Sequence, residues 1–142
     1  TGNAPFAWIL GRRYEELHGI DLSSEAADIA RAKGYKMQVG LIEECIQDLG
    51  PASFDLVFSR HVLEHVSDPD GVVEACYALT TPGGWNLHAV PMPPYTDPVH
   101  ITEFWPHEWA RLFQRVGFTV YESRRVSVLG HEEIQIKAQR PD

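Results

Sequence analysis

Residues 53–69 read SFDLVFSRHVLEHVSDP, and this stretch decides the fold. Its first half, residues 53–60, is a nearly continuous apolar run, which is typical of a strand in a sheet that is covered on both faces. Its second half contains the string H-x-x-E-H at His61, Glu64 and His65, which one class of zinc peptidase carries on a helix. The stretch therefore allows two interpretations, a strand that leads into a ligand-binding turn or a metal-binding helix.

Upstream of this stretch, strand-like and helix-like segments alternate. Residues 17–22 and 36–40 are short apolar segments with strand character. Residues 23–34 predict an Ala-rich helix, with a serine as N-cap and a glycine at its end. Residues 43–50 predict a short helix or turn.

The alternation continues downstream. A helix is predicted over about 70–80, followed by the turn TPGG at 81–84 and a strand over 85–90. Residues 91–105 are rich in proline and aromatic side chains without a period, which predicts a long loop of the kind that usually serves function. Pro106 then opens a helix, because proline favours the first helical position.

Two alternating segments, residues 118–128 and 131–139, end the chain and predict an antiparallel hairpin. Strands and helices that take turns predict an α/β fold with a mostly parallel sheet, helices on both faces and this antiparallel pair at the end. The chain has 142 residues without a repeat or a linker, so we expect one domain over residues 1–142.

Composition excludes several classes of partner. The formal net charge is -8 and the twelve lysines and arginines are scattered, so we expect no nucleic-acid partner. No apolar run approaches the roughly 18 residues of a membrane span, so we expect no membrane partner. Cys45 and Cys76 fit no metal or redox spacing and are interpreted as reduced thiols in the cytoplasm.

Several segments follow one another at the spacing of a known family: GIDLSSEAADIARAKG, VGLIEEC, SFDLVFSRHVLEHVSDP, LTTPGG and HITEFWPHEWARLFQRVGF. From Thr1 to about Arg125 the chain resembles the class I S-adenosylmethionine-dependent methyltransferases of the small-molecule type, which include the ubiquinone-biosynthesis O-methyltransferases. The resemblance implies a Rossmann-like sheet, S-adenosylmethionine as cofactor and methyl transfer to a small-molecule acceptor.

The resemblance also implies residues that bind the cofactor. Gly2 matches the last glycine of the family's G-x-G-x-G motif. Asp21 would accept hydrogen bonds from the ribose hydroxyls, and Leu22 would lie against the adenine. Ile42 and Glu43 would meet the adenine edge through a backbone N–H and a carboxylate.

The end of the strand at 53–60 would meet the reacting part of the cofactor. Ser59, Arg60 and His61 would border its methionine part and the methyl group. A hydroxyl or amine acceptor also has to lose a proton, and a histidine suits that task because its ordinary pKa lies near neutrality. His61 and His100, the latter in the long loop, are the candidate catalytic bases.

In this family the first strand lies at the sheet centre, between the strands that end at Asp21 and Ser59. This chain begins at Thr1 without a methionine, so we expect an excerpt that lacks this strand and most of the glycine motif. The flanking strands would then stand about 10 Å apart with unpaired backbone groups, and we expect weak or no binding of S-adenosylmethionine. Residues 4–13 predict a helix instead, whose apolar face carries Phe6, Ile9 and Leu10.

Two alternatives stay open. The first is a methyltransferase-like relic or binding domain that lacks activity and acts through dimerisation; a homodimer is compatible with either function. The second is a zinc hydrolase that uses His61, Glu64 and His65, with a third ligand from farther along the chain. Pro69 limits the helix for this site to barely two turns, which argues against zinc.

Overall fold

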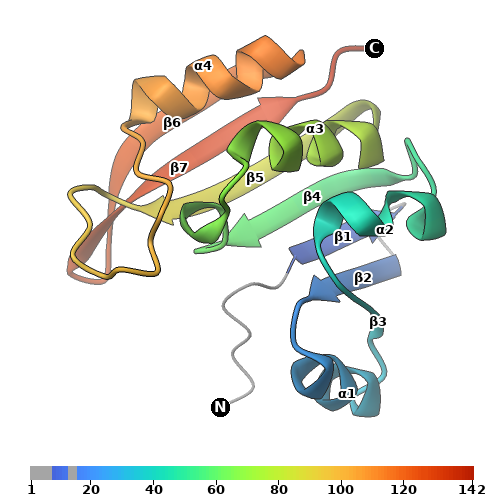
Figure 1. Cartoon of the computed structure of the whole chain (residues 1–142). Helices are drawn as coiled ribbons and strands as arrows, with labels where there is room; N and C mark the ends of the chain where they lie inside the picture. Colours follow the sequence, from blue (N-terminus) through green and yellow to red (C-terminus); the bar gives the residue numbers. More distant parts are fainter. Residues whose placement is uncertain (1–7, 13–15) are drawn as a thin grey trace.

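The structure is a computed structural model that describes residues 8–12 and 16–142 (Figure 1). In chain order its elements are β1 (Trp8–Arg12), β2 (Glu16–Asp21), α1 (Ser24–Ala32), β3 (Lys36–Val39), α2 (Ile42–Leu49), β4 (Phe54–Arg60), the single 3₁₀ turn η1 (Leu63–His65), α3 (Pro69–Leu79), β5 (Thr80–Pro91), α4 (Pro106–Val116), β6 (Thr119–Val128) and β7 (His131–Gln139).

The strands form one seven-stranded sheet in the order β3-β2-β1-β4-β5-β7-β6. β2 pairs with β3, and β4 with β5, in parallel. β1 is antiparallel to both β2 and β4, and β7 is antiparallel to both β5 and β6. All strands except β1 and β7 therefore share one direction, which confirms the predicted mostly parallel sheet with an antiparallel C-terminal hairpin.

The helix predicted at the start of the chain is wrong for residues 8–12, which form β1 at the centre of the sheet. The rest of that predicted helix lies outside the described residues. Pairing explains the difference, because a strand at this position satisfies backbone groups of both β2 and β4 that would otherwise be unpaired. The side chains alternate as a strand requires, with Trp8 and Leu10 buried and Ile9 42% exposed between them.

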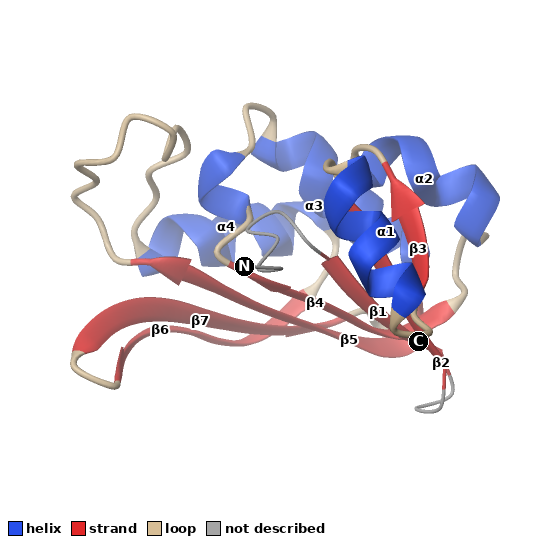
Figure 2. Ribbon diagram, turned by 90° about the horizontal axis from the view of Figure 1, so that it is seen from below, coloured by secondary structure: helices blue, strands red, loops and turns tan. Residues whose placement is uncertain are grey.

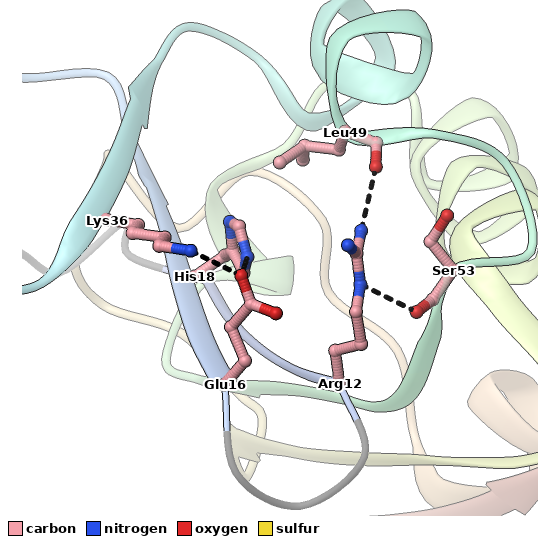
Figure 3. A network of polar contacts seen from close by, with 6 residues as sticks. All are labelled: Arg12, Glu16, His18, Lys36, Leu49 and Ser53. Atoms are coloured by element: carbon pink, nitrogen blue, oxygen red, sulfur yellow. Dashed lines mark hydrogen bonds and ion pairs between the residues drawn. The ribbon is translucent and has the colours of Figure 1, made fainter.

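Arg12 fastens the end of β1 to the helical layer (Figure 3). Its Nε donates to the carbonyl oxygen of Ser53 and its Nη2 to that of Leu49, both at 3.2 Å. Its guanidinium also lies 5.0 Å from the ring centroid of Phe54. The last turn of α2 and the start of β4 are thereby tied to the central strand.

A second polar group lies beside it in the same view. Glu16 of β2 accepts hydrogen bonds from Lys36 of β3 and, at 3.0 Å, is bonded to His18 Nε2 (Figure 3). The hydrogen bond from Lys36 lowers the pKa of Glu16 to about 2. This ion pair links the first two strands of the sheet where they start.

Figure 2 shows α2, α3 and α4 on one side of the sheet. The hydrophobic core lies between these helices and the sheet, and includes Leu10, Val57, Leu79, Trp109 and Ile136. α1 packs against β2 and β3, at the edge of the sheet that β3 forms. Among the described residues, no helix is long and apolar enough to cross a membrane.

Two local predictions differ from the structure. The TPGG segment, predicted as a turn before a strand, belongs to β5, which starts at Thr80 and accommodates Gly83 at φ +81°. The string H-x-x-E-H does not form a helix of two turns, because only η1 follows β4 and His61 stands before it at φ +56°. A positive φ at a residue with a side chain interrupts a helix, so the histidines of this string lack a common helical face.

Candidate functional site

The candidate site lies where β2, β3 and β4 end, since these strands run in the same direction. A pocket of about 160 Å³ opens here between the β3–α2 connection and the segment from η1 to α3. It is lined by Trp8, Leu22, residues 40–43, Val62, residues 65–68 and Val72. Leu22, Ile42 and Glu43, which the resemblance assigns to cofactor binding, are among these lining residues, and their role stays a prediction.

Asp21 is the last residue of β2 and is 1% exposed. Its Oδ1 accepts a hydrogen bond from the backbone N–H of Ser23 at 2.9 Å. Its Oδ2 is buried and has no hydrogen-bond partner among the described residues. Because a buried carboxylate oxygen without a partner costs free energy, this atom is a ready acceptor for a ligand hydroxyl.

Glu43, which lines the pocket, also has a carboxylate oxygen without a partner in the described part of the chain. Its Oε1 is buried without a hydrogen-bond partner among the described residues. Its neighbour Ile42 is the first residue of α2, and a backbone N–H in the first turn of a helix has no partner within the helix. The backbone N–H of Ile42, a donor, and the carboxylate of Glu43, an acceptor, therefore lie next to each other at this wall of the pocket.

Ser59 and Arg60, at the end of β4, do not line the pocket. Ser59 is completely buried, and its Oγ is 2.6 Å from His88 Nδ1. Arg60 Nη2 forms an ion pair with Glu133 Oε1 of β7 at 3.0 Å. The predicted roles of both residues in cofactor binding stay predictions, and the contacts that the structure gives them are structural.

Sequence reasoning missed a chain of buried hydrogen bonds behind the site. His88 Nε2 is 3.1 Å from Asn86 Oδ1, and Asn86 Nδ2 donates to Thr80 Oγ1. Burial lowers the pKa of His88 to about 3, so the ring is neutral, donates from Nε2 and accepts the Ser59 hydroxyl at Nδ1. The signal was available in the strand WNLHAV, in which Asn86 and His88 alternate with apolar residues.

The side chain of His61 contacts Glu133 of β7 and does not line the pocket. Its Nε2 lies 3.7 Å from Glu133 Oε1, and its backbone N–H donates to Ala89 at 2.8 Å. Burial lowers the pKa of His61, and the nearby Arg60 guanidinium lowers it further. Glu133 is fully buried and is another residue that sequence reasoning missed.

Glu64 and His65 instead gather with His100 from the long loop. Their ligand atoms lie within 4.8 Å of one another, so these residues could hold a metal ion; within the described ranges they are the single group of three of this kind. Burial raises the pKa of Glu64 to about 7, and neither of its carboxylate oxygens has a hydrogen-bond partner among the described residues. His61 is not a member of this group, so the arrangement differs from the predicted zinc site.

The long loop is fastened to η1. The backbone N–H groups of Ile101 and Thr102 donate to the Glu64 carbonyl oxygen at 2.8 and 3.0 Å. His100 stacks edge-on against His65, with 4.8 Å between the ring centroids, and against Tyr95 at 5.2 Å. The structure thus holds His100 near the pocket wall at His65, whereas His61 contacts a different set of residues.

Gly2 lies outside the described residues, so its predicted role is not addressed by the structure. The remaining predicted cofactor residues fall into two sets. Leu22, Ile42 and Glu43 line the pocket, whereas Asp21, Ser59 and Arg60 are not among its lining residues.

Known proteins resemble the chain in sequence. A family model described as "Methyltransferase domain" matches residues 1–87. The ubiquinone biosynthesis O-methyltransferase of Paraburkholderia phymatum is 41% identical over 75 residues, which are 49% of this chain and 32% of that protein. That of Chromobacterium violaceum is 35% identical over 89 residues, 59% of this chain and 38% of that protein. The matched part of the chain spans about a third of the length of these curated relatives.

Solved structures share the fold. The Burkholderia thailandensis 1,6-didemethyltoxoflavin-N1-methyltransferase, solved with its substrate and S-adenosylhomocysteine, superposes with a TM-score of 0.66 at 23% identity, covering 87% of this chain and 60% of that one. A SAM-dependent methyltransferase from Methanosarcina mazei gives a TM-score of 0.72 at 16% identity, covering 87% and 81%. At these identities the likeness demonstrates the fold alone.

Proposed function

Because the chain belongs to the family of the methyltransferase domain, whose model matches residues 1–87, we propose that it transfers a methyl group from S-adenosylmethionine to a small-molecule acceptor. One observation carries the proposal. Asp21 ends β2 as a buried carboxylate whose Oδ2 has no hydrogen-bond partner among the described residues, and the next residue, Leu22, lines a pocket together with the start of α2. This is the edge at which open α/β sheets bind nucleotides.

The residues at the pocket fit the adenosine half of the cofactor. Asp21 Oδ2 would accept from the ribose hydroxyls, and Leu22 would pack on the adenine. The Ile42 N–H and the Glu43 carboxylate would bind the adenine edge. The pocket of about 160 Å³ is smaller than the roughly 300–1,000 Å³ of ordinary ligand pockets, which agrees with the expectation of weak binding.

Gly2, Ser59 and Arg60 are proposed for the methionine half. The family pattern assigns Ser59 and Arg60 to this half. They would bind it through their backbone groups at the end of β4, because their side chains contact His88 and Glu133. The same strand end brings the Glu64–His65 turn against the pocket.

When bound, S-adenosylmethionine supplies an electrophilic methyl group. The acceptor would take this methyl group from the sulfonium, and its proton would pass to a base of the chain. His100 and His61 are the proposed bases, and the lowered pKa of His61 keeps this ring neutral and able to accept a proton near pH 7. The chain otherwise contributes alignment and exclusion of water.

A second candidate, a relic domain that no longer binds the cofactor, is favoured by the position of Trp8. Its indole is 4% exposed and forms part of the pocket wall. In this arrangement the start of β1 borders the pocket in which we propose that the adenosine half binds. The two candidates differ in whether S-adenosylhomocysteine binds at all.

Isothermal titration calorimetry of the 142-residue chain with S-adenosylhomocysteine tests the proposal. We expect a Kd weaker than about 1 µM, and a further loss of about tenfold or more in Asp21→Asn, because a hydrogen bond to a charged group contributes about 1.5–3 kcal/mol. Asp28→Asn, an exposed change on α1, is the matched control and should bind as the unchanged chain does. Absence of binding at millimolar ligand would favour the relic.

We further propose that the protein acts in the cytoplasm and forms a homodimer. The reduced state of Cys45 and Cys76, both buried and unpaired with each other, supports a reducing compartment. The acceptor is a small molecule in this proposal, as the family pattern implies.

A further inference from the structure

The turn after β4 and the long loop between β5 and α4 lie side by side (Figure 1), and they bring three side chains together. Glu64 and His65 belong to η1, and His100 belongs to the loop. We name these three residues the η1–loop cluster. One potential ligand atom of each residue lies within 4.8 Å of those of the other two. Two imidazoles and one carboxylate are a ligand set that binds divalent transition metals in proteins.

Glu64 is the member of the cluster whose charge most needs a cation. Its side chain is fully buried, and neither of its carboxylate oxygens has a hydrogen-bond partner among the described residues. Its one ion-pair contact within the described ranges is His65, whose Nε2 lies 3.6 Å from Oε2. Buried carboxylates normally have a charged partner or coordinate a metal, because desolvation of an isolated charge is costly. A cation bound between these two side chains would remove that cost.

The hydrogen bond of His65 decides which of its ring nitrogens can bind a metal. Its Nδ1 is 2.9 Å from the carbonyl oxygen of Val99. A carbonyl oxygen only accepts, so Nδ1 carries the proton, and Nε2 of the neutral ring carries the lone pair. The 3.6 Å from Nε2 to Glu64 Oε2 is too long for a hydrogen bond, but two ligands of a tetrahedral zinc ion stand about 3.3 Å apart. Imidazoles that bind metals commonly donate their other N–H to a carbonyl oxygen in this way.

The loop holds His100 in place beside these two residues. The backbone N–H of His100 donates to the carbonyl oxygen of Asp97 at 3.0 Å, and Asp97 Oδ1 accepts from the N–H of Val99 at 3.1 Å. Asp97 Oδ2 lies 3.8 Å from His100 Nε2 and adds a negative charge beside the cluster. To reach the separation of about 3.3 Å in a tetrahedral zinc site, ligand atoms within 4.8 Å have to close by at most about 1.5 Å. A rotation of the His100 side chain covers this distance.

We propose that the η1–loop cluster is a binding site for a divalent transition metal ion such as Zn²⁺, held by Glu64, His65 and His100. Three protein ligands leave the fourth position of a tetrahedral ion for water or another small ligand. The carboxylates of Glu64 and Asp97 balance the double charge of the ion, because the imidazoles bind as neutral rings. The two nitrogen ligands favour a transition metal over Mg²⁺, which prefers oxygen ligands.

His61 has no part in this site. Its Nε2 lies 3.7 Å from Glu133 of β7, so the site differs from the one that a zinc hydrolase would form with His61, Glu64 and His65. A His100 ring that binds an ion cannot also accept a proton, which leaves His61 as the base of the proposed methyl transfer. Because His65 lines the pocket, the ion would lie at the pocket wall.

Isothermal titration calorimetry of the full chain with zinc chloride, after metals are removed with a chelator, tests the proposal. We expect one Zn²⁺ per chain with a Kd of about 10 µM or tighter, and Mg²⁺ bound at least about 100-fold more weakly. Glu64→Gln and His100→Gln should each weaken the binding of Zn²⁺ by about 100-fold or more, because each removes one of three ligands. His107→Gln, at an exposed histidine of α4, is the matched control and should bind as the unchanged chain does.

Circular dichroism spectra establish that each variant is folded, and His100→Gln, on the loop, carries the test alone if Glu64→Gln does not fold. A Kd for Zn²⁺ weaker than about 10 µM, or a folded ligand variant that binds as tightly as the unchanged chain, overturns the proposal. An equal loss in His107→Gln, or Mg²⁺ bound as tightly as Zn²⁺, also overturns it. The titrations contain neither S-adenosylmethionine nor an acceptor, so their outcome is independent of methyl transfer.

Discussion

His88 illustrates how a single buried residue couples this fold to pH. The ring is enclosed between Phe113, at 5.4 Å between ring centroids, and Trp8, at 5.9 Å, with Ser59 and Asn86 bonded to its nitrogens. The native ring therefore takes up a proton only near pH 3, whereas an unfolded histidine does so near pH 6.5. Neutrality of this ring is a condition of the native packing.

The pH dependence of stability follows from this difference. Between about pH 6.5 and 3 the unfolded chain binds a proton at residue 88 that the native chain excludes, so His88 makes the free energy of unfolding fall as pH falls. We expect His88→Gln to remove a slope of about 1.4 kcal/mol per pH unit in this range. Urea unfolding of both proteins at pH 7, 6, 5 and 4 measures it; parallel curves for the two proteins would contradict it.

Individual site residues were predictable from sequence only where position along a strand decides the role. Asp21 was predicted as a cofactor residue because a carboxylate at a strand end lies at the edge where open α/β sheets bind ligands. This role stays a prediction, and the structure shows that Asp21 Oδ2 is buried without a hydrogen-bond partner among the described residues. Glu133 could not be identified, because its partners Arg60 and His61 are more than 70 positions away and only the sheet order brings them together.

At the scale of elements, β1 shows how pairing overrides local pattern. Phe6, Ile9 and Leu10 have helical spacing, but a helix here would leave the backbone of β2 and β4 unpaired. Residues 8–12 satisfy both neighbours as an extended segment. The remaining strands and helices were predictable within a few residues, since their hydrophobic periods and caps agree with their tertiary positions.

A pair of substitutions distinguishes the two conformations of this segment. On a helix Ile9 and Leu10 would share one apolar face and contribute similarly to the free energy of unfolding. In β1 Leu10 is fully buried and Ile9 is 42% exposed, so Leu10→Ala should lower the free energy of unfolding by about 2–5 kcal/mol and Ile9→Ala by less than about 1 kcal/mol. Urea unfolding at a low protein concentration provides the comparison, and equal losses would argue for a helix.

Arg12 supports the same element by a different interaction. Arg12→Met keeps much of the apolar stem but removes the donors to Leu49 and Ser53. We expect a loss of about 1.5–3 kcal/mol, because partly buried hydrogen bonds from a charged donor are strong. Arg115→Met, which removes only the exposed ion pair with Asp70, is the control and should cost less than about 1 kcal/mol. Similar melting temperatures of the two variants would show that Arg12 does not fasten β1.

At the scale of the whole molecule, α2, α3 and α4 cover one side of the sheet, and β1 reaches the edge at which the pocket lies. The sequence predicted the order and direction of most elements, because alternation of strands and helices limits the topology. It could not predict how the centre would be filled, since that depends on which segment pairs best with two strands far apart in the chain. Trp8 connects these two features, because it is the first residue of β1 and forms part of the pocket wall.

This double role predicts opposite effects of one substitution on stability and on binding. Trp8→Ala removes a side chain that is 4% exposed and should lower the free energy of unfolding by about 3–5 kcal/mol. The same change enlarges the pocket, so we expect S-adenosylhomocysteine to bind about tenfold more tightly, which corresponds to about 1.4 kcal/mol. Phe113→Ala is matched in size and burial but does not line the pocket, and it should lose stability without any gain in affinity. Isothermal titration calorimetry with S-adenosylhomocysteine, at a temperature where the unchanged chain and both variants are folded, measures the three affinities. An unchanged or weaker affinity of Trp8→Ala would mean that the indole supports the proposed nucleoside pocket and does not restrict it.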